Sequence, residues 1–170
     1  MANLLAVNFF PAFTPPASGG ELRYFHFYKQ LSQNFHVTLL SPTYSTHKRE
    51  SINHSPTLVE HRIPKDPIFD QIHAAVASEN IAEEFSALVC ALTAKHPNSF
   101  HEAFLEAQAE ADVIVHESPY MLDYDVLFGY DGRPRIYNSY NVESDLVAHD
   151  WKRPHAAKHL AHIEALERRL

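Results

Sequence analysis

The stretch from residue 4 to residue 41, LLAVNFFPAFTPPASGGELRYFHFYKQLSQNFHVTLLS, contains a complete strand–loop–helix–strand pattern. Residues 4–10 form a nearly continuous apolar run, as expected for a strand that is covered on both faces. Residues 11–20 hold three prolines and two adjacent glycines, which indicates a loop. Residues 21–33 then have apolar side chains at helical spacing, and residues 35–41 return to a strand pattern.

A capping pattern and a glycine pair mark the start of the predicted helix. Ser18 and Glu21 stand three residues apart, as the N-cap and N3 residues of a capping box do. Gly19 and Gly20 lie between them and are two of only four glycines in the chain. Glycine lets a backbone approach a ligand closely, and the N–H groups of a helix start attract anions. The pair fits neither the Walker loop nor the dinucleotide fingerprint, so the residues alone leave open whether it serves a ligand or only the turn.

The rest of the chain continues the alternation of strands and helices. It predicts strands at 57–63, 112–116 and 135–140, helices at 69–95, 98–111 and 156–170, and an exposed polar loop at 43–56. This alternation predicts an α/β fold with a doubly wound, Rossmann-like parallel sheet and helices on both faces, in one domain that covers residues 1–170. Ligands of such sheets bind at the carboxyl ends of the strands, so the residues that follow each strand are the candidates for function.

Composition narrows the class of protein. The 170 residues are 45% hydrophobic, enough for a packed core, and the net charge is −7 with no tract of lysine or arginine. The charge argues against a nucleic-acid-binding protein, and the lack of an apolar run near the roughly 18 residues of a membrane span argues against stable membrane insertion. The first residues lack the basic segment and cleavage site of a signal peptide. The single cysteine, Cys90, excludes a disulfide framework within the chain, and we expect a cytoplasmic location.

Polar residues follow two of the predicted strands. His116 and Glu117 come at the end of one strand, where such a pair can bind hydroxyl groups or transfer a proton. Tyr120 follows them, and the end of the next strand carries Asn138, Ser139, Asn141 and Glu143. The residues alone also allow simpler interpretations, in which the histidine is packed and Asn141 or Ser144 only caps a helix.

Three histidines share one face of the last predicted helix. His155, His159 and His162 have spacings of four and three residues. Such a group binds a metal only with a rigid, shielded face and supporting partners, so a solvated face is the favoured interpretation. We predict no metal site and no cofactor.

Taken in order, these segments resemble the N-terminal domain of GT-B fold glycosyltransferases, in particular the retaining family 4 group. The opening strand, proline-bearing loop and glycine pair have that group's form, and FHVTLLS is similar to its second strand. His116-Glu117-Ser118-Pro119 is similar to the group's stretch after the fourth strand. Ser139-Tyr140-Asn141-Val142-Glu143 resembles its SxHNxE stretch, with Tyr140 where many members have histidine. The resemblance covers nearly all of the chain.

The resemblance implies roles for individual residues. Gly19 and Gly20 would approach the diphosphate of the donor, and His116 would be the catalytic residue beside the transferred sugar. Glu117, Tyr120, Ser139, Asn141 and Glu143 would bind the acceptor. The whole enzyme would transfer a sugar, of hexosyl type, from a nucleotide sugar to a hydroxyl group of an acceptor, with retention and without a metal.

The same resemblance sets expectations for the chain as a piece of a larger enzyme. The family's donor-binding groups belong to a C-terminal domain, which we expect to be the partner of this one. We therefore expect the 170 residues alone to show no turnover, and we expect an exposed sheet edge that can support an edge-mediated homodimer. The alternative is a standalone Rossmann-like domain that binds a nucleotide or sugar without catalysis.

Overall fold

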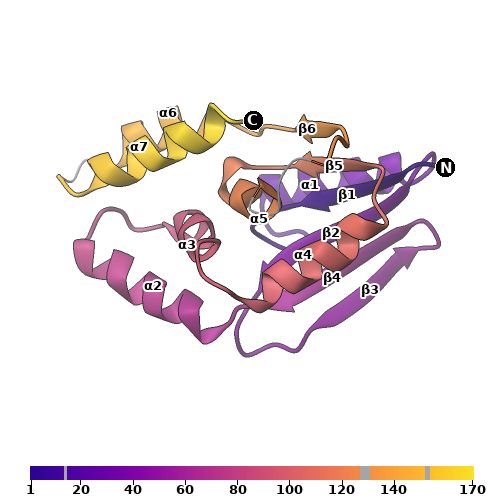
Figure 1. Ribbon diagram of the computed structural model, residues 1–170, viewed down its shortest axis with the longest axis horizontal. Helices are drawn as coiled ribbons and strands as arrows, with labels where there is room; N and C mark the ends of the chain where they lie inside the picture. Colours follow the sequence, from indigo (N-terminus) through magenta and orange to yellow (C-terminus); the bar gives the residue numbers. More distant parts are fainter. Residues whose placement is uncertain (14, 127–130, 152–153) are drawn as a thin grey trace.

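A six-stranded sheet forms the centre of the computed structural model, which describes residues 1–13, 15–126, 131–151 and 154–170 (Figure 1). The strands lie in the order β3–β4–β2–β1–β5–β6. Their bounds are β1 Asn3–Val7, β2 His36–Thr43, β3 Glu50–Ser55, β4 Leu58–Pro64, β5 Val113–His116 and β6 Arg135–Tyr137. All neighbours are parallel except β3 and β4, which are antiparallel.

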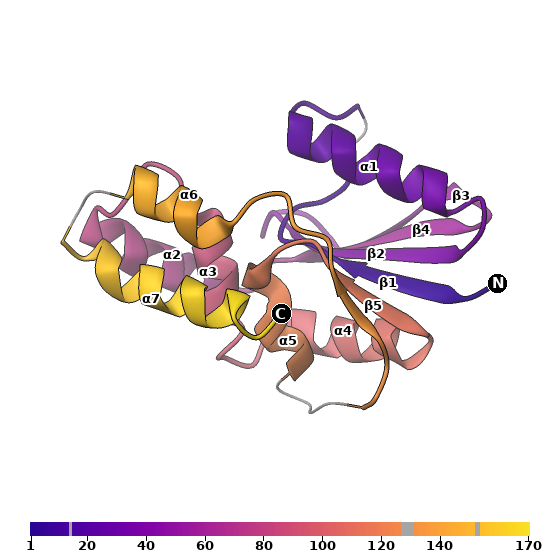
Figure 2. The same ribbon diagram turned by 90° about the horizontal axis from the view of Figure 1, so that it is seen from above.

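Helices cover both faces of the sheet. Their bounds are α1 Gly19–Leu31, α2 Pro67–Glu79, α3 Ser86–Thr93, α4 Ser99–Ala109, α5 Leu122–Val126, α6 Glu143–Asp150 and α7 Ala156–Glu167, with a 3₁₀ turn at Pro119–Met121. Figure 2 shows α1 on one face and α4 on the other. The α/β, doubly wound fold predicted from the sequence is therefore confirmed.

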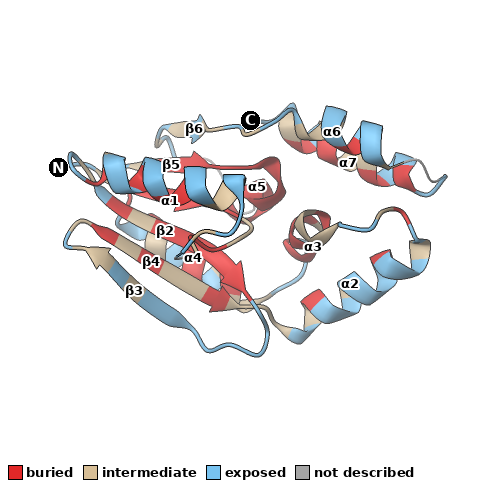
Figure 3. Cartoon of the chain, turned by 180° about the vertical axis from the view of Figure 1, so that it is seen from behind, coloured by how far each residue is buried: buried red, intermediate tan, exposed pale blue. Residues whose placement is uncertain are grey.

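Strand β1 explains why two layers of helices are needed. Successive side chains of a strand point to opposite faces. Leu4 and Ala6 pack with Tyr24 and Tyr28 of α1, whereas Leu5 and Val7 pack with residues of α4 such as Phe104. Figure 3 shows the result, with buried residues along the central strands and exposed ones along β3.

A group of helices lies beyond the carboxyl ends of the strands. Helices α2, α3, α6 and α7 stand together at this end of the sheet (Figures 1 and 2). Val147 of α6 and Ile163 of α7 pack with Ala91 of α3 and with Tyr120, which follows β5. The edge at which an α/β sheet binds its ligands is therefore partly covered by the chain's own helices.

The sequence prediction was wrong in four segments, one of which is α5, a helix that was not predicted. The predicted loop 43–56 contains strand β3, which pairs with β4 and carries the polar side chains of an exposed edge. The predicted helix 69–95 is two helices, α2 and α3, because Asn80 ends α2 in the left-handed conformation with φ of 53°. Helix α6 was not predicted. The first and last predicted strands are also shorter, and they end at Val7 and Tyr137.

The start of α1 agrees with the predicted cap. Ser18 is the N-cap, and its side chain accepts a hydrogen bond of 3.2 Å from the N–H of Glu21. The Glu21 carboxylate accepts at 2.6 Å from the N–H of Ala17, one residue before the partner of a standard capping box. Residue 14 of the predicted loop lies outside the described residues.

Strand β6 forms one edge of the sheet, and β3 forms the other. The central residue of β6, Ile136, is about half exposed. Dimerisation through this edge stays a prediction. Across the described ranges, no helix has the length and apolar character needed to cross a membrane.

Candidate functional site

A pocket of about 570 Å³ lies at the carboxyl ends of β1, β2 and β4. We call it the glycine crevice because Gly20 lines it at the start of α1. Phe9 and Phe10 from the segment after β1 line it, and so does Ser86 at the start of α3. The crevice has the position that ligands occupy in doubly wound sheets.

The glycine pair is not required by the backbone of this fold. Neither Gly19 nor Gly20 has a φ in the left-handed region. A Cβ atom at Gly19 would meet nothing within 4 Å, and one at Gly20 would make an ordinary contact of 3.7 Å with the ring of Phe10. A side chain therefore fits at both positions, so neither the turn nor the packing requires glycine, and of the two only Gly20 lines the crevice.

The charges of the crevice limit what it can bind alone. Among the described residues that line it, Lys65 is the cation and Glu21 and Glu84 are the carboxylates. Both carboxylates already accept hydrogen bonds from backbone N–H groups near a helix start, Glu21 from Ala17 and Glu84 from Ser86 at 2.6 Å. A phosphate that enters would compete with them for these groups.

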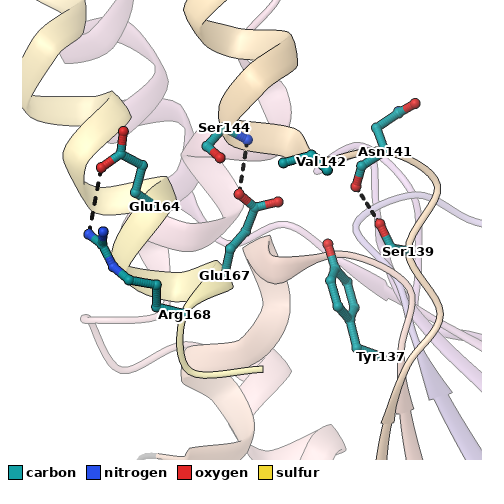
Figure 4. A pocket seen from close by; sticks show the side chains of 8 residues that line it. All are labelled: Tyr137, Ser139, Asn141, Val142, Ser144, Glu164, Glu167 and Arg168. Carbon is teal, nitrogen blue, oxygen red and sulfur yellow. Dashed lines mark hydrogen bonds and ion pairs between the residues drawn. The ribbon is translucent and has the colours of Figure 1, made fainter.

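A second hollow, of about 520 Å³, lies where β6 ends, against α7 (Figure 4). We call it the α7 pocket. Ser139 and Asn141, two of the predicted acceptor residues, line it together with Tyr137. The Ser139 hydroxyl donates to the backbone carbonyl of Asn141. On the α7 side, Glu164 and Arg168 form an ion pair of 3.6 Å. The pocket thus offers hydroxyl, amide and aromatic groups, which are the groups that bind sugars.

The start of α6 is capped by a side chain of α7. The N–H groups of Glu143 and Ser144 donate at 2.6 and 3.1 Å to the two carboxylate oxygens of Glu167 on α7. The N-cap residue is Val142 and gives no side-chain cap, so the interpretation of Asn141 or Ser144 as a cap is wrong. Sequence could not reveal this cap, because Glu167 follows 24 residues later.

Two predicted acceptor residues are bonded to each other. The Tyr120 hydroxyl donates to the carboxylate of Glu143 at 3.1 Å. Tyr120 is buried, so the expectation that it faces a ligand is wrong for this structure. Burial raises the pKa of Glu143 despite the hydrogen bond from Tyr120. The ring of Tyr120 also contacts Phe9 of the glycine crevice edge to face, at 5.6 Å between centroids.

His116 does not reach either hollow. Its ring is fully buried, and its Nε2 lies 2.9 Å from Oδ2 of Asp125 on α5. Asp125 also accepts two hydrogen bonds, of 3.0 and 2.8 Å, from the guanidinium of Arg135 at the start of β6. The expectation that the imidazole points toward the ligand edge is therefore wrong, since it points to the α4 and α5 face. His116 pairs with Tyr137 across the two strands and holds α5 against the sheet.

Glu117 is buried on the opposite face, against α1. Its carboxylate accepts hydrogen bonds from the hydroxyl of Tyr28 and, at 2.8 Å, from the side-chain amide of Asn138. It does not line the α7 pocket or the glycine crevice. The expectation that Glu117 contacts an acceptor directly is wrong for this structure.

The three histidines of α7 do not form one solvated face. His155 is exposed, whereas His159 is buried and bonded at 2.8 Å to Glu79 of α2. Burial lowers the pKa of His162, which favours its neutral form. In the described part of the chain, no group of three His, Cys, Asp or Glu side chains is arranged to hold a metal ion.

Sequence reasoning missed several residues of the glycine crevice. Tyr44 follows β2 directly, and Lys65 follows β4 directly. Both obey the rule that function follows the ends of parallel strands. Applying that rule to every predicted strand, rather than to the motif-bearing ones, would have found them.

Comparison of the chain with known proteins gives similarity to solved structures. No protein-family model matches it, and no curated protein matches it. Among solved structures, it is similar to sucrose-phosphate synthase from Thermosynechococcus elongatus, with 12% identity and a TM-score of 0.32 over 85% of this chain. Another sucrose-phosphate synthase structure from that organism gives 14% identity and a TM-score of 0.24, over 86% of this chain and 94% of that one. The chain spans about half, 50%, of the length of the first of these sucrose-phosphate synthase structures. Similarity at this level supports no inference about function.

Proposed function

We propose that this chain is the acceptor-side domain of a nucleotide-sugar-dependent glycosyltransferase. In this proposal the glycine crevice receives the diphosphate end of the donor, and the α7 pocket receives the acceptor. A second, donor-binding domain of the GT-B kind would close over the carboxyl edge of the sheet. The enzyme would transfer a sugar to a hydroxyl group of the acceptor, with retention, as the resemblance of the motifs implies.

The position of Gly20 is the observation that carries the proposal. Gly20 lies on the wall of the crevice although the fold accepts a side chain there. The first N–H groups of a helix have no acceptor within the helix, so the start of α1 can hold a phosphate oxygen. A glycine at this point keeps the path to these groups open.

The chemistry of transfer would be shared between the two domains. Departure of the nucleotide diphosphate needs positive charge or N–H donors, and the acceptor hydroxyl needs correct placement. The crevice supplies Lys65 and the helix start, but its two carboxylates oppose a phosphate. We therefore expect this domain alone to bind a nucleotide sugar weakly, with a dissociation constant of about 1 mM or higher, and to show no turnover.

Replacing each glycine by valine tests the proposal with a matched pair of variants. Gly20→Val should weaken the binding of a nucleotide sugar at least about tenfold, because a branched side chain fills the path to the helix start. Gly19→Val should leave binding near the wild-type value, because Gly19 does not line the crevice. Both variants place the same residue in the first turn of α1, so their unfolding free energies should differ little. Affinity is measured by ligand-detected NMR with UDP-glucose, ADP-glucose and GDP-mannose.

The pair separates binding at the crevice from the simple role of a turn. Equal affinity in wild type and Gly20→Val would contradict the proposal. So would an equal loss in both variants, because it would show that the valine acts through the helix and not through the crevice.

A further inference from the structure

The buried carboxylate of Glu117 joins α1, which carries part of the glycine crevice, to the segment after β6, which carries part of the α7 pocket. Glu117 is 1% exposed, and its carboxylate accepts from Tyr28 of α1 and from Asn138, which follows β6. Burial of a carboxylate is unfavourable unless hydrogen bonds compensate for lost water. The two donors come from elements that are far apart in sequence, so Glu117 joins them at one point.

Arg23 forms the outer part of the same connection. It lies one turn after Gly20 on α1, and its guanidinium donates at 3.1 Å to the side-chain oxygen of Asn138 and at 3.2 Å to the backbone carbonyl of Ser139. The guanidinium also stacks on the ring of Tyr140, 4.2 Å from its centroid. Burial, and then the nearby charge of Glu117, raise the pKa of the Tyr140 hydroxyl, so Tyr140 remains neutral there.

These contacts hold one particular segment. Residues 138–142 carry Ser139 and Asn141 on the wall of the α7 pocket, and α1 carries Gly20 on the wall of the glycine crevice. Within the segment, Ser139 and Asn141 are exposed, whereas Tyr140 packs against the core cluster that contains Tyr24 and Tyr28. The main-chain link of the segment to the sheet is the N–H of Asn138, which donates to the carbonyl of His116 at 2.9 Å.

We propose that Glu117 is a positioning residue that fixes segment 138–142 against α1 and so sets the distance between the two hollows. The role of this positioning in ligand binding rests on the proposed function, whereas the contacts of Glu117 do not depend on that function. Glu117 acts through Asn138 and Tyr28 and does not touch a ligand.

Hydrogen exchange followed by mass spectrometry tests the proposal on the whole chain. Glu117→Leu removes the acceptor at similar volume, and exchange in residues 138–142 should become about tenfold faster or more, on the scale of one lost buried hydrogen bond. Glu117→Gln keeps an oxygen that can accept from both donors, so exchange there should remain close to wild type. Tyr28→Phe removes one donor and should give an intermediate increase.

A matched control separates positioning from general stability. Tyr124→Phe also removes a buried hydroxyl, one that contacts Asn98 on the other face of the sheet, and should not change exchange in residues 138–142. Unchanged exchange there in Glu117→Leu would overturn the proposal, and so would an equal rise in every peptide. Failure of the wild type to bind UDP-glucose, ADP-glucose and GDP-mannose would contradict the proposed function alone, because the exchange result does not require a ligand.

Discussion

Replacement of Asp125 by alanine should lower the free energy of unfolding by about 3–5 kcal/mol. The carboxylate is 1% exposed and is the partner of both His116 and Arg135. Its removal takes the acceptor from the buried ring of His116 and two hydrogen bonds from the Arg135 guanidinium, which keeps those to Asp131 and to the carbonyl of Arg133. Breaking a buried ion pair by removing one partner is strongly destabilising. Urea unfolding followed by circular dichroism measures the loss.

The Arg49–Glu106 pair provides the control for this variant. Its side chains are 54% and 62% exposed, so Glu106→Ala should change the stability by less than about 1 kcal/mol. If Asp125→Ala lowered the stability as little as Glu106→Ala, the result would contradict the buried contacts of Asp125 with His116 and Arg135.

Asp125 also predicts how stability depends on pH. Burial opposes its ionisation, but hydrogen bonds from His116 and Arg135 outweigh burial and lower the pKa of the carboxyl in the folded chain. A lowered folded-state pKa gives a contribution that is complete above the ordinary value of about 4 and is lost as the pH falls below it. The stability difference between wild type and Asp125→Ala should therefore shrink in acid.

Replacement of Tyr24 by alanine should lower the free energy of unfolding by about 3–5 kcal/mol, which is the range for the loss of a large buried ring. Tyr24 is a fully buried residue of α1, and its ring packs edge to face on Phe10 at 5.8 Å and on Tyr28 at 5.3 Å between centroids. Phe10 forms a wall of the glycine crevice, so the variant should also lose ligand binding at temperatures where it remains folded.

Tyr24→Phe is the control, with an effect of opposite sign. The Tyr24 hydroxyl has no hydrogen-bond partner among the described residues. A buried polar group without a partner is unfavourable, so its removal should leave the stability equal to wild type or about 1 kcal/mol higher. A clear loss in Tyr24→Phe would reveal a partner for the hydroxyl and contradict this part of the structure.

The sequence was sufficient for elements whose pattern is local. The run at residues 4–10, the loop with the glycine pair and the helix after Ser18 were recognised because propensity, periodicity and capping agree over a few residues. Strand β3 was missed for a physical reason. An exposed edge strand lacks an apolar face, and its pairing with β4 comes from backbone hydrogen bonds that leave no pattern in the side chains.

The candidate site was harder to predict because its contacts join distant parts of the chain. The motif placed His116 and Glu117 correctly at the end of a strand, yet consecutive residues of a strand face opposite sides of the sheet. His116 therefore meets Asp125 on one side and Glu117 meets Tyr28 on the other, and neither lines a hollow. Only the packing of α5 and α1 against the sheet decides these partners. Gly20 in the first turn of α1 lines the glycine crevice, and Ser139 and Asn141 after β6 line the α7 pocket, whereas their roles in binding stay predictions.

An amide NMR titration of the wild-type chain tests whether the glycine crevice is the place where this domain binds a nucleotide sugar. UDP-glucose, ADP-glucose and GDP-mannose are added separately, up to about ten times the expected dissociation constant of about 1 mM. We expect at least one of them to shift the amide signals of Ser18, Gly20 and Lys65 in a saturable way, while signals of α4 on the far face stay unchanged. Saturable shifts confined to other surfaces, or no shift at the crevice with any of the three, would rule out the crevice as the binding site.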